Sequence, residues 1–191
     1  MTTRSHPPPS ETTFRALVDA KSGVLQADAL LPPPRSASFS VFAQRPDARL
    51  DVAQLENQAA RFFAAKLGLT VEKRYDGEVP VTDAARVVLA CDDGSAAGTR
   101  LVYGRPAQGD DHAAAEEAER RQGTFGMALL AQRCPTVWLV VREGEDDRVA
   151  LTIAAVFASA FLGPILTPEG DKLIGVRSAR LELERRSAPY R

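Results

Sequence analysis

Residues 149–166 form a continuous apolar stretch without a charged side chain, in which only Thr152 and Ser159 are polar. Asp146 and Asp147 precede the stretch and suit the N-terminus of a helix, as a cap and as negative charge. A glycine and a proline at positions 163 and 164 end it, because proline cannot continue a helix. We therefore predict a helix near residues 148–162 that is apolar on every side and is enclosed by the rest of the chain.

This predicted helix is too short to cross a membrane. A spanning helix needs about 20 apolar residues to match a hydrocarbon core of about 30 Å, whereas four helical turns extend over roughly 22 Å. Residues 1–10 are rich in threonine and proline and lack the apolar segment of a signal peptide. We therefore expect no membrane span and, by default, a cytoplasmic location.

Three further segments have the periodicity or composition of helices. The first begins at Asp51, with Gln54 as a capping-box partner, and ends at Gly68. Residues 110–122 are rich in alanine, glutamate and arginine, and residues 124–134 continue as an apolar helix after Gly123. The apolar face of the first helix is expected to consist of Leu55, Ala59, Phe62, Phe63 and Leu67.

Runs of β-branched and aromatic residues predict the strands. The predicted strands are residues 39–42, at the edge of the sheet, and residues 69–75, 86–91, 99–103, 136–141 and 173–176. Residues 86–91 and 99–103 are expected to pair as a hairpin with a longer loop. Ala179, Leu181 and Leu183 alternate with charged residues and predict a half-exposed strand, although glutamate, arginine and leucine also favour helices.

This order of elements predicts the α+β class, with a mixed, mostly antiparallel sheet of about five strands and helices packed on it. We expect the strands before and after the central apolar helix to be parallel and joined by a right-handed crossover. The central helix would lie on the sheet beside the first helix, covered by residues 124–134. The chain divides into a proline-rich N-terminal arm (1–38), a single α+β domain (39–186) and a C-terminal tail (187–191).

The N-terminal arm carries more large apolar side chains than disordered segments usually contain. We expect it to dock on the body of the protein or on a partner, whereas the alternative is a flexible arm whose apolar residues make no lasting contact. The candidate interaction residues are Phe14, Leu17, Val18, Leu25, Leu30 and Leu31.

The net charge and the spacing of the cysteines indicate which kinds of partner or ligand to expect. The formal net charge of −1 gives no overall attraction to nucleic acid or to an anionic membrane. Cys91 and Cys134 are too far apart in sequence for a metal-binding pattern, and we expect them to be buried thiols. We therefore expect no cofactor and no nucleic acid, and expect instead a protein partner or self-association.

Two groups of acidic residues are weak candidates for metal binding. Asp110 and Asp111 precede His112, and such a group can bind a divalent cation, although acids are also common in the first turn of a helix. Asp92, Asp93, Asp146 and Asp147 lie at the ends of predicted strands. If the two loops met, these carboxylates could hold magnesium; otherwise they are solvated turns.

These observations favour a non-catalytic protein–protein interaction module, such as a scaffold, adaptor or chaperone-like assembly component. It would use the N-terminal arm and apolar helical surface. The alternatives are a metal-dependent hydrolase that uses acidic loops 92–93 and 146–147, and a sensor with a small-ligand pocket between sheet and helices.

Overall fold

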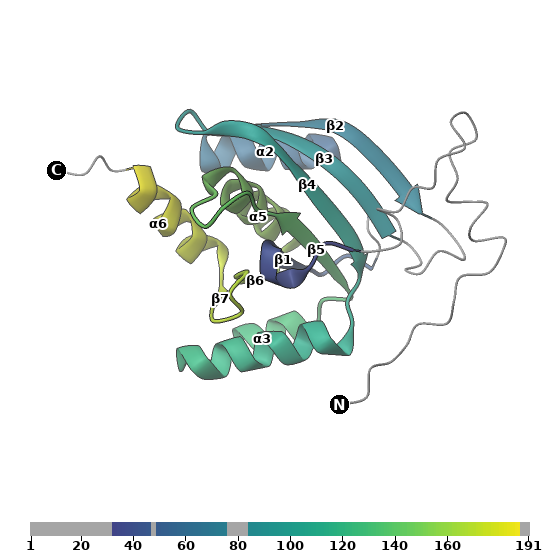
Figure 1. The fold of residues 1–191 in the computed structure, drawn as a ribbon, viewed down its shortest axis with the longest axis vertical. Helices are drawn as coiled ribbons and strands as arrows, with labels where there is room; N and C mark the ends of the chain where they lie inside the picture. Colours follow the sequence, from purple (N-terminus) through teal and green to yellow (C-terminus); the bar gives the residue numbers. More distant parts are fainter. Residues whose placement is uncertain (1–31, 47–48, 76–83, 188–191) are drawn as a thin grey trace.

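The computed structural model describes residues 32–46, 49–75 and 84–187, and these residues form one antiparallel sheet with helices on both faces (Figure 1). The sheet has seven strands in the order β2-β3-β4-β5-β1-β6-β7. The predicted α+β class is therefore confirmed, with more strands than expected. The strands are β1 (Ser38–Ala43), β2 (Lys66–Tyr75), β3 (Ala84–Asp92), β4 (Ala97–Pro106), β5 (Thr136–Val141), β6 (Ile165–Leu166) and β7 (Leu173–Ile174).

The central helix α5 (Arg148–Phe161) forms where the sequence predicted it. The side chain of Asp147 caps it by accepting a hydrogen bond from the backbone N–H of Ala150, 2.9 Å away. Every residue from 149 to 161 except Ser159 is buried. Trp138 of β5 contacts Phe157 edge-on and stacks on Phe161, with ring centroids 5.4 and 6.0 Å apart.

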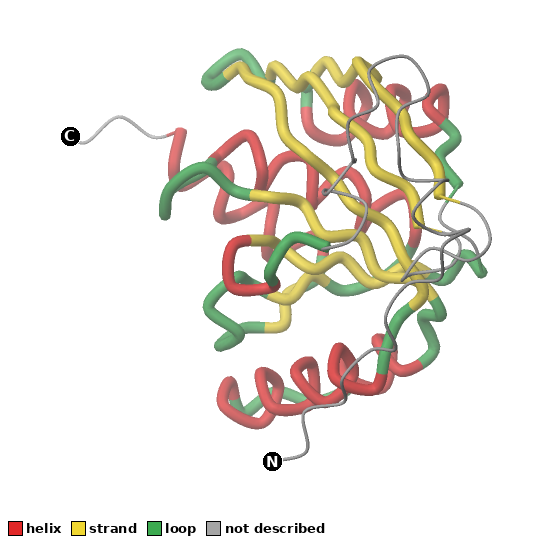
Figure 2. The backbone as a smooth tube through the Cα atoms, turned by 45° about the vertical axis from the view of Figure 1, so that its right-hand side comes forward, coloured by secondary structure: helices red, strands yellow, loops and turns green. Residues whose placement is uncertain are grey.

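Helix α2 (Val52–Phe63) packs beside α5 on the same face of the sheet. Figure 2 shows these helices behind the strands. Asp51 caps α2 as predicted, since its carboxylate accepts from the N–H of Gln54. The predicted end at Gly68 is wrong, because Ala64 adopts the left-handed conformation and stops the helix four positions earlier. Leu67 and Gly68 belong to β2 instead.

β1 lies inside the sheet, so the prediction of an edge strand is wrong. It pairs antiparallel with β5 on one side and with β6 on the other, and all six of its residues are buried. Because both neighbours run antiparallel to β1, β5 and β6 run in the same direction, with α5 connecting them. The expected parallel strand at residues 173–176 is also wrong, since β7 pairs antiparallel with β6.

The last element is helix α6 (Val176–Ser187), which contradicts the predicted half-exposed strand at Ala179, Leu181 and Leu183. Ala179 and Leu183 are buried, whereas Leu181 is 46% exposed. Four-residue spacing places the first two side chains on one helical face, and α6 packs against α5 there. Helix α6 therefore covers the central helix, in the role expected of residues 124–134.

Part of the opposite face of the sheet, toward β7, is covered by α3 (Gly109–Gln122) and α4 (Met127–Gln132). These helices pack with Phe42, Tyr103 and Leu139 in a second apolar cluster. The predicted helix over residues 124–134 is therefore too long and placed on the wrong face. No helix within the described part of the chain is long and apolar enough to cross a membrane.

Candidate functional site

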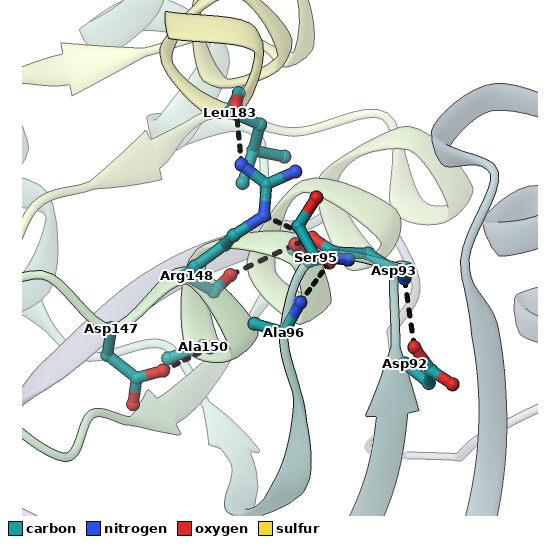
Figure 3. Close-up of polar contacts among 10 residues, drawn as sticks. Asp92, Asp93, Ser95, Ala96, Asp147, Arg148, Ala150 and Leu183 are labelled. Carbon is teal, nitrogen blue, oxygen red and sulfur yellow. Dashed lines mark hydrogen bonds and ion pairs between the residues drawn. The ribbon is translucent and has the colours of Figure 1, made fainter. Parts of the chain in front are cut away.

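A group of four mostly buried charged side chains lies where α5 begins (Figure 3). It combines the β3–β4 loop, β4, the loop after β5 and the first turn of α5. Asp93 comes from the β3–β4 loop, Arg100 from β4, and Asp147 and Arg148 from the start of α5. The two acidic loops predicted from the sequence therefore do meet, because α5 packs against both hairpin strands.

Asp93 is held by four donors. Its Oδ1 accepts from the N–H groups of Ser95 and Ala96, at 2.9 and 2.8 Å, and thereby shapes the β3–β4 turn. Its Oδ2 accepts from Arg148 Nε at 2.6 Å and from the hydroxyl of Thr152 at 3.1 Å. Burial acts to raise the pKa of Asp93, but these hydrogen bonds and the charge of Arg148 outweigh it and hold the pKa below its ordinary value.

Asp147 is bound in the same manner by Arg100. The guanidinium donates from Nε at 2.5 Å and from Nη2 at 2.9 Å, and only 1% of the Asp147 side chain is exposed. The N–H groups of Glu143 and Ala150 donate to the same carboxylate at 2.6 and 2.9 Å. Burial raises the pKa of Asp147, yet the Arg100 hydrogen bond and the two backbone donors together lower it below the usual range.

The remaining two acids of these loops lie outside this cluster of ion pairs. Asp92 accepts from the N–H of Gly94, as in a solvated turn. Asp146 is 96% exposed and lies 3.6 Å from Arg186. A divalent cation at the cluster would have to displace Arg100 and Arg148 from Asp147 and Asp93. Among the residues that the structure describes, no three His, Cys, Asp or Glu side chains are arranged to hold a metal ion.

A cavity of about 300 Å³ opens beside Asp93 and Arg148. Its walls come from the end of α2, the β3–β4 loop, the first turns of α5 and the middle of α6. Phe63 and Leu183 supply apolar lining, and Thr152 supplies a hydroxyl. Arg148 also donates to the backbone oxygen of Leu183, so it ties α6 to α5 at the cavity wall.

The other predicted acidic group forms a structural ion pair. Asp111 accepts two hydrogen bonds from Arg105, at 2.6 and 2.9 Å, and one from the N–H of Gln108 at 2.8 Å. Burial would raise the pKa of Asp111, but Arg105 lowers it below the ordinary value. His112 points elsewhere: its Nε2 lies 3.4 Å from the carbonyl oxygen of Cys134, and its ring stacks on Phe42. Asp110 is an exposed residue of the first turn of α3.

Sequence reasoning identified the acids but not their partners. Arg100 and Arg105 occupy ordinary strand positions, and nothing local indicates that each faces a carboxylate from another element. The i, i+4 spacing of Arg148 and Thr152 was the one available signal, because it places both on the face of α5 that meets Asp93. The six predicted interaction residues of the N-terminal arm lie outside the described residues.

Comparisons with protein-family models, with curated proteins and with solved structures found no match.

Proposed function

We propose that this protein is a non-catalytic protein–protein interaction module. Its first contact is the corner between α3 and α4, formed by Phe125 and Leu129, and its second contact is the N-terminal arm. The observation that carries the proposal is the exposure of Phe125, which is 95% accessible, and of Leu129, four positions later, which is 56% accessible. Large apolar side chains that stand together in solvent often mark a site of association.

The turn that presents Phe125 is fixed on both sides. Glu119 of α3 accepts from the N–H of Met127 and Ala128, at 2.6 and 3.1 Å, and so caps the start of α4. Its own carbonyl oxygen accepts from the N–H of Thr124. A backbone segment that is fixed before binding loses little conformational freedom when a partner covers it, which favours affinity.

The local sequence offers Phe125 an intramolecular contact that it does not make. It precedes Gly126, the N-cap of α4, and a residue there often packs on the fourth helical residue as a hydrophobic staple. That residue is Leu130, yet Phe125 stays exposed. Burying a phenylalanine against a partner contributes roughly 1.5–3 kcal/mol.

The surroundings suit a protein with an apolar pocket as the partner. Glu117, Arg120 and Arg121 form mixed ion pairs on the exposed face of α3 next to the corner. A central aromatic residue with a polar rim of both signs is the usual arrangement of a specific interface. A membrane surface would instead favour a predominantly basic rim.

The test compares the full chain with the double variant Phe125→Ser, Leu129→Ser. Proteins retained by the wild-type chain from its native cell are identified, purified and titrated by calorimetry. We expect the double variant to weaken binding at least tenfold with unchanged circular dichroism. Leu181→Ser, a change at an exposed leucine of α6 that lies away from this corner, serves as the matched control. Equal affinity of the wild type and the double variant for every purified partner, and for a second copy of the chain, would refute the proposal.

A small-ligand sensor is the second candidate, and it rests on the cavity beside Asp93 and Arg148. A volume of about 300 Å³ is at the lower end for ligand sites, and its mixture of apolar and polar lining is typical of them. A metabolite panel screened by thermal shift tests this function. A ligand whose stabilisation is lost in Phe63→Ser would favour the sensor, and magnesium-dependent stabilisation would favour a metal-dependent hydrolase.

A further inference from the structure

The outer faces of β3 and β4 carry an apolar patch formed by Val88, Ala90 and Leu101. Side chains alternate along a strand, so Val87, Leu89 and Cys91 point into the core beneath α5, and Val88 and Ala90 point to the other face. Val88 pairs with Leu101, and Ala90 with Thr99, across the two strands. The three apolar residues of this outer-face patch are partly buried.

The described helices do not cover this patch. Helices α2 and α5 lie behind β2, β3 and β4, whereas α3 lies below them, toward β6 and β7 (Figures 1 and 2). The contacts that α3 and α4 make with the sheet concentrate on β7. Val88, Ala90 and Leu101 belong to neither of the two core clusters formed by the described residues.

The N-terminal end of the described chain reaches the sheet on this same face. Arg35 donates to the backbone oxygen of Asp110 and lies 3.5 Å from the carboxylate of Asp111. That carboxylate is bound by Arg105, which follows Leu101 and Tyr103 on the outer face of β4. Arg105 lies four strand residues, about 13 Å, from Leu101, and Arg35 contacts the carboxylate that Arg105 binds.

We propose that the apolar part of the arm, residues 14–31, docks on the outer-face patch of its own chain. The inference goes beyond the proposed function, because it names a surface of the same chain that the arm contacts. Residues 14–31 extend at most about 60 Å, several times the distance required. A tethered segment has an effective concentration in the millimolar range, which favours its own body over a second copy. A contact with the patch would remove the apolar residues at positions 14, 17, 18, 24 and 25 from water.

Trypsin cleavage measures the docking, because Arg15 and Lys21 lie within the arm. We expect Leu101→Asp to speed cleavage at these two sites at least tenfold relative to the wild-type chain. Leu181→Asp, the same change at an exposed position of α6, should leave the rate unchanged. Leu25→Asp should also speed cleavage at Lys21, and this variant cannot disturb the packing of the sheet. Equal rates in the wild type and both arm-releasing variants would overturn the docking.

A photo-crosslinking amino acid at position 101 distinguishes docking in cis from exchange between copies. At 1 µM protein, a dimer whose Kd is well above about 1 µM is mostly dissociated. Under this condition we expect crosslinks from position 101 to residues 14–31 within one chain. The same amino acid at position 129 should not reach the arm. Crosslinks between chains, or none to the arm, would overturn the inference. The crosslinking result does not depend on whether the double variant Phe125→Ser, Leu129→Ser loses partner binding. The inference can therefore be refuted while the proposed function stands, and the reverse also holds.

Discussion

Replacing Asp147 with alanine should destabilise the protein by about 3–4 kcal/mol. The variant loses the N-cap of α5, which contributes about 1 kcal/mol. It also leaves Arg100, whose side chain is only 12% exposed, without its main partner, and breaking a buried pair costs about 3–5 kcal/mol. Glu143 remains 3.2 Å from Arg100 and offsets part of the second loss.

Urea denaturation followed by circular dichroism measures this change. With a slope of roughly 2 kcal/mol per molar urea, the midpoint should fall by about 1.5–2 M. Asp146→Ala is the matched control, because Asp146 is the adjacent residue and 96% exposed, and its effect should stay within about 0.5 kcal/mol. A loss below about 1 kcal/mol in Asp147→Ala, or equal losses in both variants, would refute the reasoning.

The pH dependence provides a second check on the same residue. The folded protein holds the pKa of Asp147 below its ordinary value of about 3.9. The stability that this carboxylate contributes is therefore complete above about pH 4 and is lost as the pH falls from there through the folded pKa. The difference between wild type and Asp147→Ala should be constant from pH 5 to 8 and should shrink below about pH 4. A difference that grows on acidification would contradict the ion pair.

Three other predictions follow from the packing. Gly104→Ala places a Cβ within 2.6–2.7 Å of the Trp138 ring, so it should lower the free energy of unfolding by about 1–3 kcal/mol and shift the tryptophan emission. Cys91 and Cys134, whose burial raises their pKa to about 12 and about 11, should react with a disulfide reagent at pH 8 only after unfolding. Ala64→Gly relieves a left-handed residue at the end of α2 and should raise the free energy of unfolding by about 0.5 kcal/mol, measured by urea denaturation.

The central helix could be predicted because its signals are local. The absence of charge, the cap at Asp147 and the glycine and proline that follow lie within one stretch of chain. The hairpin strands and β5 were also predictable, since β-branched runs bounded by turn residues are short-range patterns. The place of β1 within the sheet was not, because strand order depends on pairing between distant segments.

The wrong predictions have particular physical causes. Residues 176–187 combine good helix formers with an alternation of apolar and charged residues. The segment forms a helix because Ala179 and Leu183 can then both pack on α5. At residues 123–126, Gly123 and Gly126 both adopt positive φ angles, which delay the start of α4 and leave Phe125 in solvent. The pairing of acids with arginines is a tertiary property that charge clusters along the sequence do not specify.

The position of β1 also constrains the order in which the protein can assemble during synthesis. Ser38 pairs with Val141, about 100 positions later, and Ser40 pairs with Leu166, later still. The β2–β4 meander contains only neighbouring strands and can form while the ribosome is still translating α5. The early segment 38–43 stays unpaired until both of its neighbouring strands have been synthesised. During that time its apolar side chains are exposed and can be bound by chaperones.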